Sequence, residues 1–419
     1  MTLRREPIPV KTAIQRVINH TTKYLSTETV PLGHAYGRIL AAPIIAEHDV
    51  PPFNRAAFDG YALRARDTIN ASETNEVYFN VIGTIGAGHT ATEPLQAYTA
   101  YRIMTGAALP KGADAVVMLE ETEARNDGFI IRKRLKQDDN IMLKGEDAQK
   151  GESLIEAGTV IHPGTIALLA TFGYSEVSVA KQPQVSVIAT GTELLDVSAP
   201  LEHGKIRNSN GPMLQAQLAR MGINASMLGV LVDDPDKATD VLKDALTTAD
   251  VIITTGGVSV GDFDYLPEIY RRIGAEVLFN KVMMRPGSVT TVAHVDGKLL
   301  FGLSGNPSAC YTGFELFTRP ALLRMMGCKA CYLPHMKAVL CEDFPKANPF
   351  TRFIRAIWTL NGSRVEVVPA GFNKSNAVSS IARGNCFIVL PSGSSRYEKG
   401  MEVDILLLGQ EQGVTTWSL

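Results

Sequence analysis

Between residues 183 and 327, short β-branched runs alternate with helical stretches, and this feature constrains the fold most. The runs VSVIAT (185–190), ASMLGVLV (225–232) and VIITT (251–255) are separated by amphipathic segments at 211–222 and 236–249. Continuous apolar runs are typical of strands buried on both faces. Strands that alternate with helices predict a mainly parallel sheet with right-handed crossovers. Further strands are expected at 276–284, 289–295 and 299–303, before a long final helix to about 327.

The flanking segments follow other patterns. Residues 10–25 have apolar side chains at helical spacing, and 165–173 predicts a second helix. Residues 46–144 carry short β-rich runs separated by turn signals, and the chain is β-rich again after 333. We therefore expect an α/β multidomain fold with four parts. These are a helical linker domain (1–45 plus 145–180), a β-rich inserted domain (46–144), a central α/β domain (181–328) and a C-terminal β-barrel-like domain (329–419).

Charge and cysteine content exclude several classes of protein. Lysine and arginine total 41 against 43 acidic residues, so a nucleic acid or an anionic membrane is not the expected partner. No apolar run reaches the roughly 18 residues of a membrane span, and no apolar stretch follows Arg4 and Arg5 as a secretory signal requires. Five cysteines are an odd number for a disulfide framework, which favours a reducing cytoplasm.

One group of cysteines offers metal-ligand spacing. Cys328, Cys331, His335 and Cys341 form C-x2-C-x3-H-x5-C, which provides four zinc ligands in principle. The spacing is less regular than in structural zinc sites, and Cys341 lies in a run that predicts a strand. Buried thiols are therefore the favoured interpretation.

The ends of the predicted strands carry the candidate chemistry, because ligands of open parallel sheets bind beyond the carboxyl ends of the strands. Glycine, hydroxyl and carboxylate groups recur at four of these ends. They are Glu193 after the first strand, Asp233 after the second, Thr255, Gly256, Gly257 and Asp264 after the third, and Ser304, Gly305, Asn306, Pro307 and Ser308 after the last. Ordinary turn and cap chemistry is the alternative.

Glycines at these positions let backbone amides approach a ligand, and the helix that follows GNPS favours an anion at its N-terminus. Neither a P-loop nor a G-x-G-x-x-G fingerprint is present. Carboxylates repel a phosphate unless a divalent cation lies between them, so Mg2+ is implied. Lys281 and Arg285, on the strand before Pro286-Gly287, could neutralise an oxyanion, or could lie on a solvated strand face.

A second set of residues in the β-rich insert is unremarkable when taken alone. Asp59-Gly60, Thr105-Gly106 and Gly145-Glu146-Asp147 are ordinary turn sequences.

Nine segments nevertheless occur in an order that resembles the molybdopterin molybdenumtransferases, the family that includes the C-terminal domain of gephyrin. They are PPFNRAAFDGYALR, RIMTGAALPKGADAVVMLEET, GEDAQKGE, ATGTELL, KIRNSN, VDDP, TTGGVSVGDFDY, MRPG and GLSGNPSA. The resemblance covers essentially the whole chain.

The resemblance implies that the protein takes adenylylated molybdopterin and molybdate, releases AMP and inserts molybdenum into the dithiolene in a Mg2+-dependent reaction. It implies a homodimer whose inserted domain faces the α/β domain of the partner, and the molybdopterin adenylyltransferase as a further partner. Its functional polar positions match Asp59, Thr105, Asp147, Glu193, Asp233 and Asp264.

Within this set, Glu193, Asp233 and Asp264 would hold Mg2+ on the adenylylated phosphate. Gly256, Gly257, Gly305 and Asn306 would anchor the phosphates through their amides. Asp59, Thr105 and Asp147 would orient molybdate or the dithiolene across the dimer.

Several positions depart from the family pattern. Asn208 stands where an acid is usual, Ser288 where lysine is usual, Ser304 where proline is usual, and Arg285 where lysine is frequent. The stretch with Asn54 and Arg55 is less acidic than usual, and a tungstate preference stays open.

Two rival functions remain from the sequence. One is a pyrophosphatase of the competence-damage-inducible type with a related α/β domain, and the other is a pterin-binding scaffold without turnover. The inserted domain argues against the first, and the retained carboxylates argue against the second.

Overall fold

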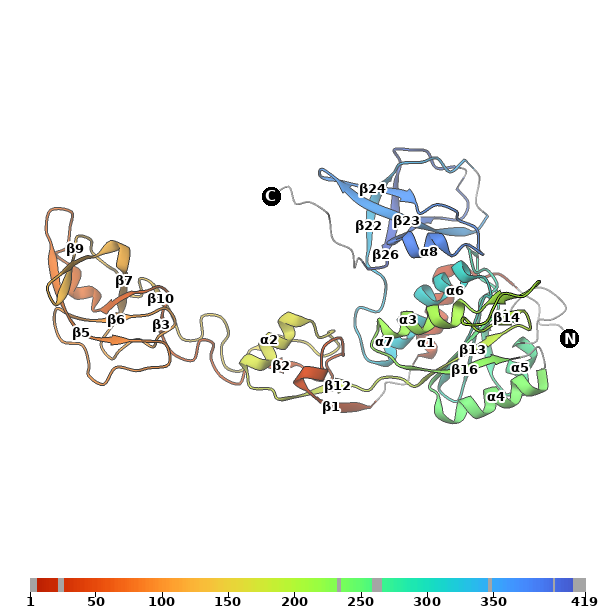
Figure 1. Ribbon diagram of the computed structural model, residues 1–419, viewed down its shortest axis with the longest axis horizontal. Helices are drawn as coiled ribbons and strands as arrows, with labels where there is room; N and C mark the ends of the chain where they lie inside the picture. The colour runs from red at the N-terminus through yellow and green to blue at the C-terminus, as the bar shows by residue number, and fades with distance from the viewer. Residues whose placement is uncertain are drawn as a thin grey trace. The chain divides into compact units, whose positions relative to one another are not determined.

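The computed structural model describes residues 6–21, 26–231, 235–257, 266–345, 349–394 and 396–409. The chain forms two compact units, each described by itself below (Figure 1). The first unit comprises Met1–Ala41, Gly158–Pro163 and Glu176–Leu419, and the second comprises Ala42–Ala157 and Gly164–Ser175. Among the described residues, no helix is both long and apolar enough to cross a membrane.

The α/β domain of the first unit contains a six-stranded sheet. Its order is β16 (Ala225–Leu231), β13 (Val185–Thr190), β17 (Val251–Thr255), β21 (Lys298–Leu303), β20 (Thr291–Val295) and β18 (Glu276–Phe279). The first four strands are parallel, as predicted, whereas β20 and β18 pair antiparallel. The reversal occurs at Asp296-Gly297, where both residues have positive φ, as a tight hairpin turn requires. The sheet is therefore mixed.

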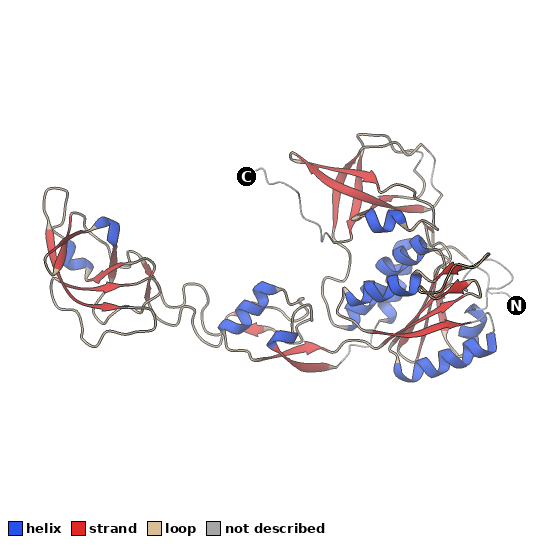
Figure 2. Ribbon diagram, viewed as in Figure 1, coloured by secondary structure: helices blue, strands red, loops and turns tan. Residues whose placement is uncertain are grey.

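Helices cover both faces of this sheet (Figure 2). On one face, α1 (Val10–His20), α3 (Asn210–Ala219) and α7 (Arg319–Met325) pack with Val187 of β13. On the other face, α4 (Pro235–Thr248) and α5 (Leu266–Arg272) pack with Ile188. Adjacent strand residues point to opposite faces, so the strands are apolar throughout and the domain has three layers.

The C-terminal domain is a closed five-stranded β-barrel, which confirms the predicted barrel-like fold. Pairing runs from β23 (Thr351–Asn361) through β24 (Arg364–Pro369), β22 (His335–Leu340), β26 (Glu402–Leu407) and β25 (Cys386–Leu390) back to β23. A short helix, α8 (Ser379–Arg383), lies in this otherwise β-rich segment.

Two expected elements are corrected by the structure. The strand expected at 276–284 is interrupted: β18 ends at Phe279, and β19 (Met284–Arg285) joins β23 of the barrel. Between these strands the Lys281 carbonyl accepts from the Ile8 amide and the Val282 amide donates to the Ser288 carbonyl, so this part of the chain pairs outside the six-stranded sheet. The first helix ends at His20, since Thr21 leaves helical φ/ψ and its hydroxyl donates to the Val17 carbonyl.

The cysteines with metal-ligand spacing lie at the join between α7 and the barrel. Cys328 and Cys331 are buried, and the Cys331 thiol donates to the Cys328 carbonyl at 2.9 Å, whereas His335 is exposed. Within the described ranges, no group of three or more His, Cys, Asp or Glu residues is arranged to hold a metal ion.

The second unit contains another six-stranded sheet. Its order is β7 (Ala115–Met118), β4 (Gly60–Leu63), β6 (Thr99–Ile103), β5 (Val77–Ile85), β9 (Gly128–Ile131) and β8 (Glu123–Arg125). Stacked rings of Tyr61, Phe79 and Phe129 form the centre of its core. The expected second helix is α2 (Pro163–Thr171).

Candidate functional site

Two adjoining pockets form one cleft between the α/β domain and the C-terminal barrel. Their volumes are about 600 Å³ and 590 Å³. Ser288, Val289, Ser304 and Asn306 line both, so the two pockets are continuous. Pockets of this size hold small-molecule ligands and cofactors.

The α/β side of the cleft is built from the ends of β13, β17 and β21. Gly256 follows β17 with φ +93°, and a Cβ there would lie 2.3 Å from the Thr190 carbonyl oxygen, so only glycine fits. Gly257 and Gly305 lie in the same wall. A wall of small residues lets a ligand approach the backbone closely, as the sequence predicted for these strand ends.

Asn210 ties two of these strand ends together. Its Nδ2 donates to the Thr255 hydroxyl at 2.7 Å and to the Gly305 carbonyl at 2.8 Å, and the Thr255 hydroxyl donates to the Ser304 carbonyl at 3.2 Å. Asn210 is buried at the first turn of α3. Asn210 was not among the predicted site residues, although it ends the KIRNSN segment.

The opposite end of the cleft carries four cations. Arg285 of β19 and Arg352 of β23 are cross-strand partners, and Arg355 and Lys374 line the same pocket. Among the described residues lining this pocket there is no carboxylate. Burial, and next the charge of Arg285, lower the pKa of Arg352. Four cations without an acid form a site for an anion.

Arg355 is the most deeply buried of these cations, with 1% of its surface exposed. Its Nε donates to the Ser380 hydroxyl at 3.2 Å and its Nη2 donates to the Lys374 carbonyl at 3.1 Å. Burial lowers the pKa of Arg355 to about 10, so the group still carries its charge at neutral pH. A buried charge normally has a counter-ion, and an anionic ligand would provide one.

Sequence reasoning missed Arg352, Arg355 and Lys374. They lie on a barrel strand and its neighbouring loop, 67 or more residues beyond Arg285 in the chain, and no local motif connects them to it. The available signal was two arginines in one short β-run, which is also typical of a solvated strand face.

Of the three acids predicted for the cleft, one lies among the described residues. Glu193 is exposed in the turn after β13 and lines the cleft. Asp233 and Asp264 lie outside the described residues. Asn208, which replaces the usual acid, accepts from the Gly211 amide at 3.0 Å and so caps the start of α3.

Of three further predicted residues, two lie outside the cleft and one lines it. Lys281 does not line the cleft, and its carbonyl accepts from the Ile8 amide. Ser308 is fully buried, with its amide donating to the Ser375 carbonyl and its hydroxyl to the Ala377 carbonyl. Pro307, which lines the cleft, is the first residue of α6 (Pro307–Gly313). Ser308 thus joins the barrel to the α/β domain.

In the second unit, the structure brings Asp59 and Thr105 together. One oxygen of Asp59 accepts from both the amide and the hydroxyl of Thr105, each at 2.7 Å. The hydroxyl bond, then the amide bond, hold the pKa of Asp59 below its ordinary value. Asp147 is exposed in a turn, and its own backbone amide donates to the Val50 carbonyl. The structure therefore supplies an ionised, oriented carboxylate at Asp59.

Comparison with protein families finds three consecutive matches along the chain. Residues 8–173 match the MoeA N-terminal region (domain I and II), residues 186–324 match a probable molybdopterin binding domain, and residues 337–408 match the MoeA C-terminal region (domain IV).

Individual relatives match over nearly the full length. The molybdopterin molybdenumtransferase of Staphylococcus aureus (strain COL) is 54% identical over 404 residues, which is 96% of each chain. The Staphylococcus epidermidis enzyme of the same name is 52% identical over the same share. The crystal structure of the molybdopterin biosynthesis moeA protein from Pyrococcus horikoshii OT3 superposes with a TM-score of 0.84 at 32% identity, covering 96% of this chain and all of that one.

Proposed function

This chain belongs to the family of molybdopterin molybdenumtransferases, transferases of molybdenum cofactor biosynthesis, and we propose that its cleft is where molybdate and adenylylated molybdopterin react. The reaction releases AMP and places molybdenum on the dithiolene of the pterin. The observation that carries the proposal is the acid-free cluster of Arg285, Arg352, Arg355 and Lys374 at one end of a cleft whose other end is a glycine wall.

The charge of the cleft differs between its two ends, and we assign the cationic end to molybdate and the glycine wall to the pterin nucleotide. Molybdate is a compact dianion, and the cationic pocket offers guanidinium groups that can donate several hydrogen bonds to one oxyanion. Arg355 is held by Ser380 and Lys374 and needs no rearrangement to receive it. Ser288, where lysine is usual, lies at the junction of the two pockets, so the nearby arginines supply the charge in its place.

The glycine wall suits the pterin nucleotide. Gly257 and Gly305 lie at adjacent strand ends, where backbone amides can approach the phosphates. The Gly256 amide, which was also expected to bind phosphate, instead donates to the Leu303 carbonyl and so joins two strand ends of the wall. The Asn210 bridge holds two of these strand ends in register. The phosphoanhydride would then lie between the glycine wall and the cationic pocket.

We propose Mg2+ as the metal of this reaction, held by Glu193, Asp233 and Asp264. Carboxylate oxygens are the ligands that Mg2+ prefers, and Glu193, the one described member of the set, is exposed at the cleft and able to take a ligand. When bound, the metal would polarise the phosphoanhydride and stabilise charge on the departing AMP. Glu193→Gln should raise the Mg2+ concentration needed for half-maximal AMP release, and unchanged Mg2+ dependence would remove Glu193 from the set.

We further propose that the active protein is a homodimer in which Asp59, Thr105 and Asp147 of one copy act on the site of the other. The family resemblance supports this assignment, and the bonds of Thr105 to Asp59 supply a fixed carboxylate for it. Mixing inactive Asp59→Ala and Glu193→Ala chains tests the idea. Activity that returns in purified heterodimers supports a shared site, and heterodimers that stay inactive argue against it.

We also propose, from the family resemblance, a cytoplasmic location and the molybdopterin adenylyltransferase as a partner. A cytoplasmic enzyme that receives its substrate from the molybdopterin adenylyltransferase fits a chain of near-neutral charge whose cysteines form no disulfide. Co-purification of the two enzymes from cell extract, compared with an unrelated cytoplasmic enzyme, would test the partnership.

One experiment separates the proposed function from its rivals. The full chain is incubated with adenylylated molybdopterin and Mg2+, with and without molybdate, and AMP is measured. AMP release that requires molybdate supports insertion. Cleavage without molybdate would indicate a pyrophosphatase, and binding without cleavage would indicate a scaffold. Tungstate in a parallel series tests the preference for the oxyanion.

A further inference from the structure

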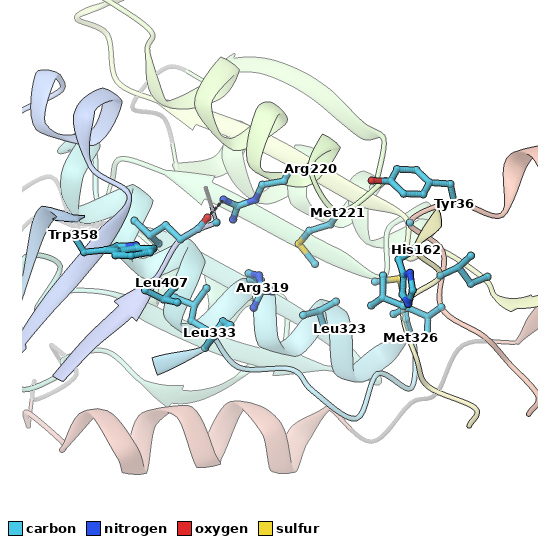
Figure 3. Close-up of a pocket in the computed structure, with 17 residues that line it drawn as sticks. Tyr36, His162, Arg220, Met221, Arg319, Leu323, Met326, Leu333, Trp358 and Leu407 are labelled. Atoms are coloured by element: carbon cyan, nitrogen blue, oxygen red, sulfur yellow. Dashed lines mark hydrogen bonds between the residues drawn. The ribbon is translucent and has the colours of Figure 1, made fainter. Parts of the chain in front are cut away.

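A pocket of about 560 Å³, separate from the two that form the cleft, lies in the first unit and shares no lining residue with them. It is bounded by the ends of α3 and α7, by the barrel strands β23 and β26, and by the segments around Tyr36 and His162 (Figure 3). Its volume falls within the range of sites that enclose small organic molecules. Neither substrate of the proposed reaction has been assigned to it.

Two arginines supply the charge of this pocket. Arg220 follows α3 and Arg319 opens α7, and in Figure 3 Arg319 rises from its helix into the middle of the pocket. Both share one carboxylate, that of Glu315, whose side chain is fully buried. Glu315 does not itself line the pocket, and the described residues that do line it include no acid, so two arginines share one carboxylate.

The geometry leaves the second arginine poorly compensated. Arg220 Nη2 lies 2.6 Å from Glu315 Oε1, whereas Arg319 Nε lies 4.0 Å from Glu315 Oε2, beyond hydrogen-bond distance. Glu315 Oε2 has no hydrogen-bond partner among the described residues. Burial lowers the pKa of Arg319, and the charge of Arg220 adds to that effect against the attraction of Glu315.

Both guanidinium groups are nevertheless fixed in position. Arg220 Nη1 donates to the Leu408 carbonyl at 2.9 Å, and Arg319 Nη1 donates to the Cys331 carbonyl at 3.0 Å. An anion that enters would therefore meet donors that are already oriented, and would lose little free energy in ordering them.

The rest of the pocket is apolar. Leu323 and Met326 of the α7 region, Leu333, and Trp358 and Leu407 of the barrel form its walls, with Met221 beside Arg220 (Figure 3). A hydrated inorganic ion would leave this surface in water. A ligand that covers it must carry an apolar body.

We propose that this pocket binds a small amphipathic carboxylate, with its carboxylate on Arg319 and Arg220 and an aromatic or branched aliphatic body against Trp358, Leu407 and Leu323. Charge complementarity selects the carboxylate, and the apolar walls select the body. The proposal is independent of the reaction in the cleft.

Naphthoate and naphthylmethanol are a suitable pair of probes, because they share one ring system and differ in charge. Calorimetric titration of the full chain should show naphthoate binding about tenfold more tightly, which corresponds to about 1.4 kcal/mol. Arg319→Gln should remove this advantage, and Arg319→Lys should keep part of it. Glu315→Gln should tighten naphthoate binding, since it removes the competing negative charge. Arg271→Gln, on the exposed face of α5, is the matched control and should change nothing.

Four results would overturn the proposal. The first is equal affinity for the two probes, and the second is unchanged naphthoate affinity in Arg319→Gln. The third is competition by molybdate, which would place the probe in the cleft. The fourth is a naphthoate affinity that falls as the chain self-associates, with self-association measured by sedimentation at each protein concentration. That result would show that a second copy of the chain covers the pocket. Failure of Glu315→Gln to fold leaves the Arg319 variants to decide.

Discussion

Arg285 and Arg352 are directly opposite each other in the parallel pairing of β19 with β23, so two arginines from different domains lie side by side in the cleft. Like charges at such positions destabilise a sheet unless something neutralises them. Arg285 precedes the last strands of the α/β domain in the chain, although its short strand pairs with the barrel, and Arg352 belongs to the barrel itself. An oxyanion bound between them would stabilise both the site and the junction of the two domains.

Molybdate should therefore raise the melting temperature of the full chain. A ligand at about 100 times its Kd adds about 2.7 kcal/mol to the free energy of unfolding, when it does not bind the unfolded chain. Arg352→Gln should reduce this shift at a given molybdate concentration, whereas Arg364→Gln, on the exposed start of β24, should leave it unchanged. Equal shifts in both variants and in the wild type would mean that molybdate binds elsewhere.

Gly256→Ala should destabilise the protein far more than Gly274→Ala. Both glycines have positive φ, which costs an alanine about 1–2 kcal/mol. A Cβ at Gly256 would also lie 2.3 Å from the Thr190 carbonyl oxygen, whereas nothing lies within 4 Å of one at Gly274. Denaturant unfolding measures the difference. Similar free energies of unfolding for the two variants would show that the backbone around Thr190 and Gly256 can shift at little cost to make room for the Cβ.

Asn210→Ala should lower activity and stability together. The substitution removes the donor that joins the buried Thr255 hydroxyl to the Gly305 carbonyl, at a cost of about 1–3 kcal/mol. Thermal unfolding and AMP release on the same preparation measure both effects, with Asn361→Ala, at the exposed end of β23, as the control. Full activity in the Asn210→Ala protein would show that the hydrogen bonds of Asn210 are not needed for the reaction in the cleft.

Thr105→Val should raise the pKa of Asp59, because the hydroxyl of Thr105 is the largest cause of its lowered value. Thr105→Ser should keep it low. A carboxylate whose pKa is lowered by folding stabilises the native state above its unfolded pKa, and that contribution is lost as the pH falls through its native pKa. Carboxyl chemical shifts in an NMR pH titration report the value. A pKa unaffected by Thr105→Val would mean that the backbone amide alone holds it.

The sequence allowed the α/β domain to be predicted because the buried strands are continuous apolar runs that alternate with helical segments. The glycine wall of the cleft could be predicted for the same reason: the residues after 185–190, 251–255 and 299–303 meet at one edge of a parallel sheet. The insert and the barrel follow from the density of short β-runs and turns.

The cationic pocket could not be predicted locally. Lys281 and Arg285 were expected on one strand, but the break between β18 and β19 separates them and places Arg285 in the barrel sheet. Arg355 belongs to the cleft only because the barrel closes, which is a long-range consequence of pairing between β23 and β25. Ser308 likewise seemed a ligand residue at a helix start, and long-range contacts with Ser375 and Ala377 occupy its donors.

Molybdate-dependent AMP release by Arg355→Gln shows whether the cationic pocket binds molybdate. The variant is given adenylylated molybdopterin and Mg2+, and molybdate is titrated, with Arg364→Gln as the matched surface control. We expect the control to behave as the wild type. We expect Arg355→Gln to need at least about tenfold more molybdate for half-maximal release, since it loses a buried charge worth about 1.4 kcal/mol or more to the bound dianion. A wild-type molybdate dependence in a correctly folded Arg355→Gln protein would contradict the assignment of the cationic pocket to molybdate.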